Sequence, residues 1–345
     1  MINRWVSLPL LIALTAAAPA DDLSRLRARL VELAAQERAG VAKAQTVAAR
    51  LSALNAAEAD LKARTGANQR SLTRLLGALQ SYRRNPPPAL LVSPRSAKDA
   101  VQAAILMRAI APELQRRAQH LAQEGKALNA LRREILIADG EFLGAEHDVA
   151  DRRAEIEALA EEKLRLEGPA DPALTARADA VGRATAVDSV GAVVTGIMTP
   201  DVATTSPMEG SSIRLIPPAS GPPARRFGDA FPGHGRTQGW SWRAPEGAVV
   251  VSPTAGRVVY ARPLKGWGFV VILSTPGGYH LVLAGLERAI AREGGEMAAG
   301  EPVGRLAKPV VIDPKQPPTA PEIYLEIRKG AKPLDPAPFF AAKSG

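Results

Sequence analysis

The sequence contains no cysteine, and both histidine and aromatic residues are scarce. Among 345 residues there are four histidines, and Phe, Trp and Tyr together make up 4%. The lack of cysteine excludes disulfides, zinc sites built from thiolates and cysteine nucleophiles. Four histidines make a metal site based on imidazole ligands hard to assemble. The low aromatic content of a chain rich in Ala, Leu, Arg and Glu favours long helices over one large globular core.

Basic residues outnumber acidic ones. Lys and Arg number 44 against 35 Asp and Glu, which gives a formal net charge of +9. This excess alone fits nucleic acid, an anionic membrane surface or no specific partner. Hydrophobic residues make up 46% of the chain, which is too much for a fully disordered protein.

Residues 1–20 have the pattern of a secretory signal peptide. Arg4 precedes an apolar run at 6–14, and an Ala-Pro-Ala cleavage site ends at Ala20. The apolar run is shorter than the ~20 residues that a spanning helix needs, and no later stretch is long enough either. We therefore expect an exported protein without a membrane span, which argues against nucleic acid as a partner.

Residues 21–168 carry two heptad repeats whose first and fourth positions are mostly apolar. The first repeat begins at Leu23 and the second at Leu114. Sustained heptads predict coiled-coil helices, and no helix can run through the three prolines at 86–88. Two arms with a break between them predict an antiparallel hairpin. The polar heptad positions are interpreted as solvated or register-setting, with a specific buried role as the alternative; they are Glu37, Glu58 and Asn68.

The predicted tip of the hairpin, residues 86–112, is more apolar than its arms. Its large apolar residues include Leu90, Leu91, Ile105, Leu106 and Ile110. Two interpretations are open: a local cap over the end of the hairpin, or an apolar patch offered to a partner.

Residues 169–222 read as a connector bounded by Pro and Gly. One interpretation is a flexible linker. The alternative is a regulatory helix that rests on the next domain, because 173–197 carries a thin apolar row. That row consists of Leu174, Val181, Val187, Val190 and Val194. A helix this short is marginal in isolation.

Residues 223–341 are predicted to form a compact β domain. Apolar, β-branched runs alternate with glycine turns, as at 249–251, 257–260, 269–273 and 322–328. No helical pattern separates them, so we expect an all-β sandwich or half-barrel. The expected fold class is thus α+β in separate domains, a long antiparallel coiled-coil hairpin followed by an all-β domain.

Seven motifs of this domain occur in an order that is specific to one family. They are Arg226-Phe227-Gly228, Ala244-Pro245-Glu246-Gly247, Ala255-Gly256-Arg257-Val258, Gly266-Trp267-Gly268, Gly300-Glu301-Pro302-Val303-Gly304, Leu325-Glu326-Ile327-Arg328 and Leu334-Asp335-Pro336. Together they resemble the LytM domain of the M23 zinc endopeptidases, which cut peptidoglycan cross-links. The resemblance implies an all-β LytM-like (M23 peptidase-like) fold.

The residues that carry the zinc chemistry of that family are absent. Aligned on the motifs, its metal ligands and catalytic histidines fall at Thr237, Ser241, Gly285, Glu322 and Tyr324. Hydroxyl groups are poor zinc ligands at neutral pH, and one carboxylate cannot hold the metal alone. The resemblance therefore implies a degenerate domain that is not an enzyme and has no metal or cofactor. His234 and His280 lie outside the motif and are interpreted as surface or strand-face residues.

An export signal, a coiled-coil hairpin and a degenerate LytM domain together resemble the EnvC-type murein hydrolase activators. The blocks at 85–94 and 104–106 are similar to those of bacterial members. The resemblance implies a periplasmic, septum-associated activator of N-acetylmuramoyl-L-alanine amidases, which controls septal peptidoglycan hydrolysis and daughter-cell separation. It also implies recruitment of the tip by an FtsEX-type division complex, peptidoglycan as a further partner, and a helix that can cover the LytM groove.

In such a protein the former substrate groove would bind a helix or loop of the amidase and favour the open amidase. The residues expected to contact it are Gln238, Ser241, Trp267, Leu283, Tyr324 and Arg328. Aromatic and Arg side chains dominate interface energetics, although Trp267 and Tyr324 could simply pack on the sheet. Of Trp240 and Trp242, one is expected to face the core and the other the groove or solvent.

Two other functions stay open at this point. One is an active M23 zinc murein endopeptidase, which would bind zinc and lyse murein by itself. The other is a non-catalytic murein-binding scaffold, which would leave a cognate amidase unstimulated.

Overall fold

The structure is a computed structural model that describes residues 18–84, 96–184, 190–197, 213–231, 235–307 and 321–340. Most of the predicted signal peptide lies outside these ranges, and so do the predicted break at 86–88 and the rest of 85–95. Leu90 and Leu91 of the predicted tip lie outside them too. Ile105, Leu106 and Ile110 fall in a helix, but their side chains are not among those described.

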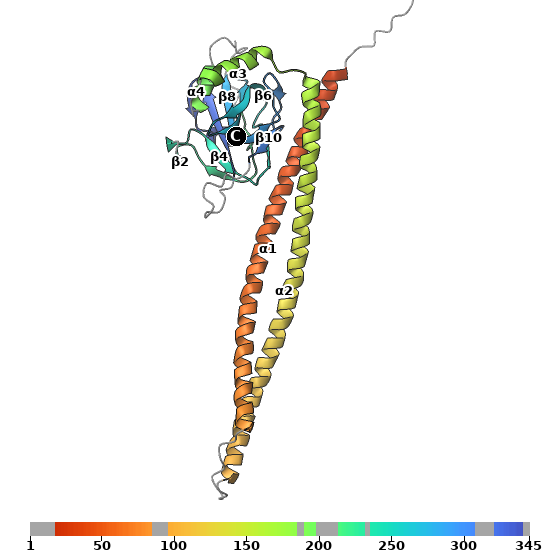
Figure 1. The fold of residues 1–345 in the computed structure, drawn as a ribbon, viewed down its shortest axis with the longest axis vertical. Helices are drawn as coiled ribbons and strands as arrows, with labels where there is room; N and C mark the ends of the chain where they lie inside the picture. Colours follow the sequence, from red (N-terminus) through yellow and green to blue (C-terminus); the bar gives the residue numbers. More distant parts are fainter. Residues whose placement is uncertain are drawn as a thin grey trace, which may run out of the picture. The chain divides into compact units, whose positions relative to one another are not determined.

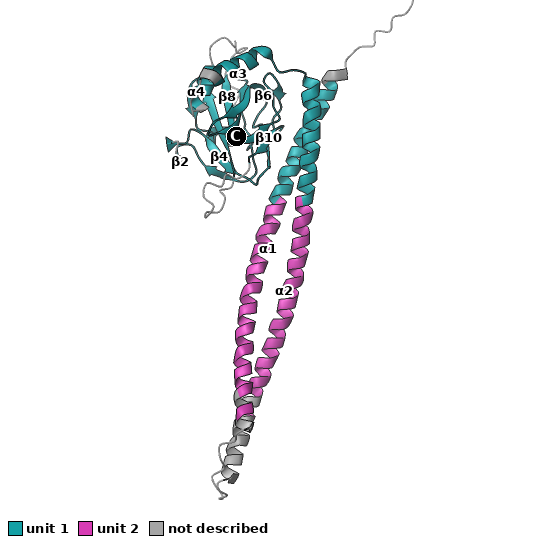
Figure 2. Cartoon of the chain, viewed as in Figure 1, with its two compact units in different colours: residues 1–42, 147–345 teal, residues 43–146 magenta. Residues whose placement is uncertain are grey.

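The chain divides into two compact units, which Figure 2 colours separately. Unit 1 comprises Met1–Ala42 and His147–Gly345, and unit 2 comprises Lys43–Glu146. Two long helices each contribute residues to both units: α1 (Ala18–Arg84) and α2 (Ser96–Glu167). Helix α2 continues through Pro112, within the predicted tip.

Polar contacts between α1 and α2 show how the two helices run within unit 2. Arg50 pairs with Glu134 at 2.9 Å and Glu58 with Arg132 at 2.9 Å, and the Asn68 amide donates to Glu124 at 2.9 Å. As the residue number rises along α1, the number of its partner on α2 falls. The two helices are therefore antiparallel, as the heptad pattern predicted (Figure 1).

The rest of unit 1 is an antiparallel β domain with short helices. The helices are α3 (Pro172–Ala184), α4 (Val190–Ile197) and α5 (Ala337–Phe340). The strands are β1 (Pro223–Arg225), β2 (Ala230–Phe231), β3 (Gly235–Arg236), β4 (Trp240–Arg243), β5 (Val249–Val251), β6 (Gly256–Leu264), β7 (Gly268–Thr275), β8 (Tyr279–Ala289), β9 (Glu296–Met297), β10 (Pro302–Leu306), β11 (Glu322–Lys329) and β12 (Lys332–Leu334). The predicted fold class is confirmed.

The main sheet runs in the order β1-β4-β11-β8-β7-β6-β9, with β12 beside β11 and β10 joining β5 to β8. Strands β7 and β8 are joined by a tight turn in which Gly277 and Gly278 both have positive φ, the region that glycine adopts without a steric cost. Strands β2 and β3 form a separate two-stranded sheet.

Because side chains alternate along a strand, the central strands bury two apolar faces. One face forms the main core, with Leu281, Leu283, Leu325 and Ile327. The other face carries side chains from β7, β8 and β11 and is packed against α3 and α4 (Figure 1). We call it the covered face; it consists of Val270, Ile272, Val282, Ala284 and Tyr324.

The main core extends before residue 223. Leu215 and Ala219 are buried in it, and the Leu215 amide donates to the Phe339 carbonyl at 2.9 Å. The Val251 amide likewise donates to the Pro218 carbonyl at 3.0 Å. The predicted boundary at 223 is therefore too late, because residues 213–222 belong to the β domain.

Within unit 1, the ends of α1 and α2 pack directly on the β domain. Leu30, Leu33 and Ile156 share a buried cluster with Val249 and Val251. This cluster joins the helix pair to strand β5, so the described part of unit 1 has a core that includes both.

Two ion pairs accompany that cluster. Glu37 is buried and accepts a hydrogen bond from Arg153 Nε at 2.8 Å, while Arg153 Nη1 donates to the Glu246 carbonyl at 3.3 Å. The interpretation of Glu37 as a solvated heptad position is therefore wrong, because the β domain covers it. Lys163 and Glu301 form a second pair, with side chains that are 2% and 0% exposed.

None of the helices in the described residues is both long and apolar enough to cross a membrane.

We predict that Lys163→Met destabilises the β domain by about 3–5 kcal/mol, because it leaves the Glu301 carboxylate buried without its counter-ion. Urea unfolding followed by tryptophan fluorescence measures this, since Trp240, Trp242 and Trp267 all lie in the domain. The double variant Lys163→Met/Glu301→Gln should recover much of the loss. The control is Arg165→Met, which breaks an exposed pair with Glu162 and should cost less than ~1 kcal/mol. Equal effects at 163 and 165 would contradict the prediction.

We also predict a pH dependence that arises from His280 on β8. Burial lowers the pKa of His280 below its ordinary value of 6.5, and its Nδ1 atom is buried without a hydrogen-bond partner. The unfolded chain therefore takes up a proton more readily than the folded one, so stability falls as pH drops through 6.5. His280→Gln should lose less stability between pH 7.5 and 5.5 than the unmodified chain. His147→Gln, at an exposed site on α2, should leave the pH dependence unchanged.

Candidate functional site

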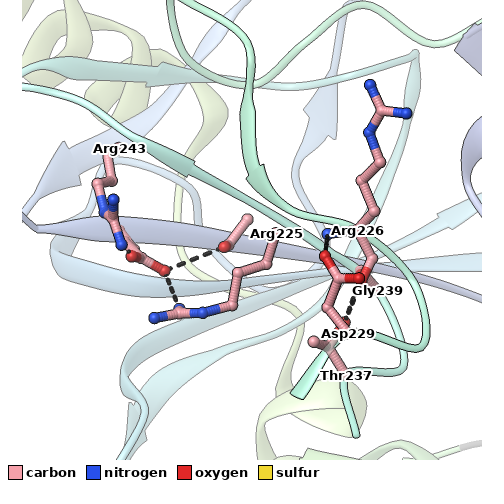
Figure 3. Close-up of polar contacts among 8 residues, drawn as sticks. Arg225, Arg226, Asp229, Thr237, Gly239 and Arg243 are labelled. Atoms are coloured by element: carbon pink, nitrogen blue, oxygen red, sulfur yellow. Dashed lines mark hydrogen bonds and ion pairs between the residues drawn. The ribbon is translucent and has the colours of Figure 1, made fainter. Parts of the chain in front are cut away.

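The positions predicted as former zinc ligands lie on β4, on β11 and in the loops beside them. Thr237 is buried, and its hydroxyl donates to the Gly239 carbonyl at 2.6 Å and lies 3.1 Å from the Arg226 carbonyl. The Thr237 amide also donates to the Asp229 carbonyl at 2.9 Å. Figure 3 shows Thr237 held within this loop. Its hydroxyl is thus engaged with the protein's own backbone.

Glu322 is the one carboxylate among the five former ligand positions, and two arginine side chains form ion pairs with it. Arg243 Nε donates to its Oε1 at 2.8 Å, the Ser241 hydroxyl donates to its Oε2 at 3.0 Å, and Arg225 forms an ion pair with it. Figure 3 shows Arg225 and Arg243 directed toward this carboxylate. Two of the five predicted positions, Ser241 and Glu322, are thus bonded to each other.

The remaining two positions, Gly285 and Tyr324, are equally unsuited to a metal. Gly285 has φ +104°, and a Cβ there would lie 2.3 Å from the Glu322 carbonyl oxygen, so a side chain could enter only if the backbone moved. The Tyr324 hydroxyl donates to Glu326 Oε2 at 2.9 Å. Burial, and next the Glu326 charge, raise the pKa of Tyr324, which keeps the phenol neutral.

The residues at these five positions do not fit a zinc ion, because they provide hydroxyls bonded internally, one carboxylate paired with arginines, and no imidazole. Within the described ranges, no cluster of three or more His, Asp or Glu is placed to hold a metal.

A buried charged network lies beside Tyr324. Arg328 Nε donates to Glu326 Oε1 at 2.5 Å, and Arg328 Nη2 lies 3.4 Å from the Gln238 Oε1 that accepts from it. Burial raises the pKa of Glu326, and the Arg328 charge opposes this rise. The Glu326 and Arg328 side chains are both buried, so each charged group needs the other as its counter-ion. Sequence analysis did not single out Glu326, although it stands between two predicted contact residues.

The structure brings most of the predicted contact residues together at the covered face. The Trp267 ring lies 5.2 Å from the Tyr324 ring, centroid to centroid, and packs at the edge of that face. Gln238 and Arg328 are joined by the hydrogen bond above, and Ser241 pairs with Tyr324 across β4 and β11. Aromatic and cationic side chains therefore lie next to an apolar surface.

Two expectations about this region are wrong. Leu283 is buried in the main core, because it is one residue out of phase with Val282 and Ala284 on the covered face. Trp240 and Trp242 both pack toward the main core, where each contacts Phe340. Residues two apart in a strand share one face, so they could not face opposite ways.

Helices α3 and α4 lie over the covered face. Val193 and Val194 of α4 are fully buried, and Ala178 and Val181 of α3 join them against the sheet. Arg328 Nη1 donates to the Gly191 carbonyl in the first turn of α4 at 3.3 Å. The described part of the connector is therefore helical and packed, which favours the helix interpretation over a flexible linker.

The apolar row read from the sequence was only partly correct. Val181 and Val194 are buried, but Val193 and Ile197 were missed, and Val187 lies outside the described residues. The missed signal was the spacing of Val190, Val193, Val194 and Ile197, which is the i, i+3, i+4, i+7 pattern of one helix face.

Comparison with known proteins agrees with this geometry. The model of peptidase family M23 matches residues 235–336. Over 122 residues the chain is 28% identical to the murein hydrolase activator EnvC of Escherichia coli (strain K12); this region is 35% of the present chain and 28% of EnvC.

Two solved structures match part of the chain at lower identity. Csd3 of Helicobacter pylori is 20% identical with a TM-score of 0.32, and the match covers 38% of this chain and 34% of Csd3. The catalytic domain of lysostaphin from Staphylococcus simulans is 19% identical with a TM-score of 0.30, over 34% of this chain and 90% of that one. The peptidase M23 model therefore matches most of the β domain, and the chain is similar to EnvC over about a third of its own length.

Proposed function

We propose that this protein is a non-catalytic activator of N-acetylmuramoyl-L-alanine amidases that controls septal peptidoglycan hydrolysis and daughter-cell separation. One observation carries the proposal. Side chains at the former ligand positions are hydrogen-bonded within the protein, while the covered face beside them binds helix α4. A domain with this arrangement works by binding a segment of a partner. The likeness to EnvC, a murein hydrolase activator, supports a murein hydrolase as the partner, and we take that hydrolase to be an amidase.

The mechanism is competition for the covered face. An amidase whose inhibitory segment binds there is shifted toward its open form, by as much as its two states differ in affinity. Helix α4 occupies the same face in this chain, so it must leave before the amidase binds. The free protein is therefore self-inhibited, and activation requires release of α4.

The rest of the proposed function is carried by the resemblance. Residues 1–20 direct export to the periplasm, and the tip residues Leu90, Leu91, Ile105, Leu106 and Ile110 bind the periplasmic domain of an FtsEX-type complex at the septum. Peptidoglycan is a further partner, as the substrate that the activated amidase cleaves.

Release of dye from labelled murein tests the proposal. A cognate amidase should release more dye with the purified chain than without it, and the chain alone should release none. Zinc-dependent release by the chain alone would instead identify an M23 endopeptidase. Binding to murein without stimulation of any amidase would identify a scaffold.

We predict that Val194→Asp raises stimulation of the amidase several-fold in the full chain. A carboxylate cannot stay on the buried side of α4 without a partner, so α4 leaves the face. The matched control is Thr195→Asp, which adds the same charge one residue away at an exposed position. It should stimulate as the unmodified chain does. Equal behaviour of the two variants would reject α4 as the inhibitory element.

We further predict that Trp267→Ala, in the Val194→Asp background, abolishes stimulation. Loss of one aromatic anchor costs about 2 kcal/mol or more, or roughly 30-fold in affinity. The control is Phe227→Ala, an exposed aromatic residue that is not part of the covered face. Arg328→Ala is a poorer test, because it would leave the Glu326 carboxylate buried without a counter-ion and so disrupt the sheet locally. Undiminished stimulation by the Trp267 variant would reject this face as the amidase site.

A further inference from the structure

Helices α3 and α4 cover the same face but are held there by different interactions. Helix α3 is tied to the β domain by ion pairs just before its first turn and within the helix. Asp171, before its first turn, pairs with Arg257 at 2.9 Å, and Asp179 pairs with Arg262. Arg262 also donates to the Thr175 carbonyl at 3.3 Å.

Main-chain contacts reinforce the start of α3. The Asp171 amide donates to the Glu293 carbonyl at 3.1 Å, and Asp171 Oδ1 accepts from the Ala173 amide at 3.0 Å as a helix N-cap. Arg292 donates to the Gly168 carbonyl just before it. Each ion pair is partly exposed and contributes little alone, but together with the main-chain bonds they fix α3 in one position.

Helix α4 has no ionisable side chain, so no ion pair can hold it. Its sequence is Val-Gly-Ala-Val-Val-Thr-Gly-Ile, and an isolated helix of eight residues is marginal in water. What holds it is burial of Val193, Val194 and Ile197, together with the Arg328 hydrogen bond to Gly191. Another helix with the same kind of apolar side chains can replace all of these contacts.

We propose that α4 alone leaves the covered face, while α3 stays on β6 as a fixed anchor. This rests on the proposed function and specifies how the site is regulated. It also specifies the partner: a short uncharged helix with β-branched side chains at the spacing of Val193, Val194 and Ile197. Because α3 stays, that helix needs a small residue opposite Val181, where a Cβ at Gly196 would lie 3.1 Å from a Val181 methyl group.

Hydrogen–deuterium exchange of the unmodified full chain tests directly whether α4 leaves the covered face without α3. Amides of α4 should exchange at least tenfold faster than those of α3, because α4 opens locally without α3. Equal exchange rates in the two helices would overturn the proposal. This measurement uses no amidase, so it is independent of the proposed function.

A single disulfide gives the second test, since the chain has no cysteine of its own. The Cβ of residue 181 and a Cβ built at residue 196 are 3.7 Å apart, within the range of ~3.5–4.5 Å that a disulfide requires. In Val181→Cys/Gly196→Cys, oxidation ties α4 to the anchored α3. We expect exchange in α4 to slow to the rate of α3 and amidase stimulation to fall at least tenfold, both restored by reduction.

The single variants Val181→Cys and Gly196→Cys cannot form this bond and serve as controls that do not respond to oxidation. Full stimulation by the oxidised double variant would mean that the helices leave together and would overturn the proposal. If exchange behaves as expected but neither the oxidised nor the reduced chain stimulates an amidase, the proposed function is wrong. The inference that α4 leaves the covered face without α3 then still stands.

Discussion

The second apolar face of the main sheet is the constraint on which the rest of this domain depends. Strands β7, β8 and β11 bury one face in the main core, and the opposite face presents Val270, Ile272 and Val282 as well. A contiguous apolar surface is rarely left exposed to water. In this chain α3 and α4 cover it, so the sheet stabilises the helices and the helices occupy the surface where a partner would bind.

The former metal site and the covered face differ in how they are stabilised. At the former site, the Thr237 hydroxyl is bonded to the backbone, and the Glu322 carboxylate is bonded to Ser241 and to two arginines, so these side chains are engaged with the protein itself. On the covered face, α4 contributes apolar contacts, which another helix can replace, and one carbonyl that accepts from Arg328. A hydrogen-bonded former metal site next to a face whose covering helix can be replaced suits the proposed binding of a partner helix.

Packing within unit 1 explains why α3 can act as an anchor. The buried pair of Lys163 and Glu301 and the cluster around Leu30, Leu33 and Ile156 attach the end of α2 to the β domain. Helix α3 begins a few residues after α2 ends at Glu167, so its start is fixed on both sides. Breaking one partner of a buried pair is costly, which makes this junction the stable part and leaves α4 as the weakly held part.

The sequence by itself determined the local features of this protein. Heptads predicted the antiparallel helices, glycine turns and β-branched runs predicted the strands, and the motif order predicted the M23-type domain. Only the tertiary structure decided what each element packs against. Leu283 and Val282 have equal apolar character, and their faces follow from pairing with β7 and β11. Glu37 is buried only because the β domain meets the helix pair there, and Val193 and Ile197 matter only because the sheet offers them a surface. Side-chain period is a property of the chain, whereas burial depends on a neighbour that is distant in sequence.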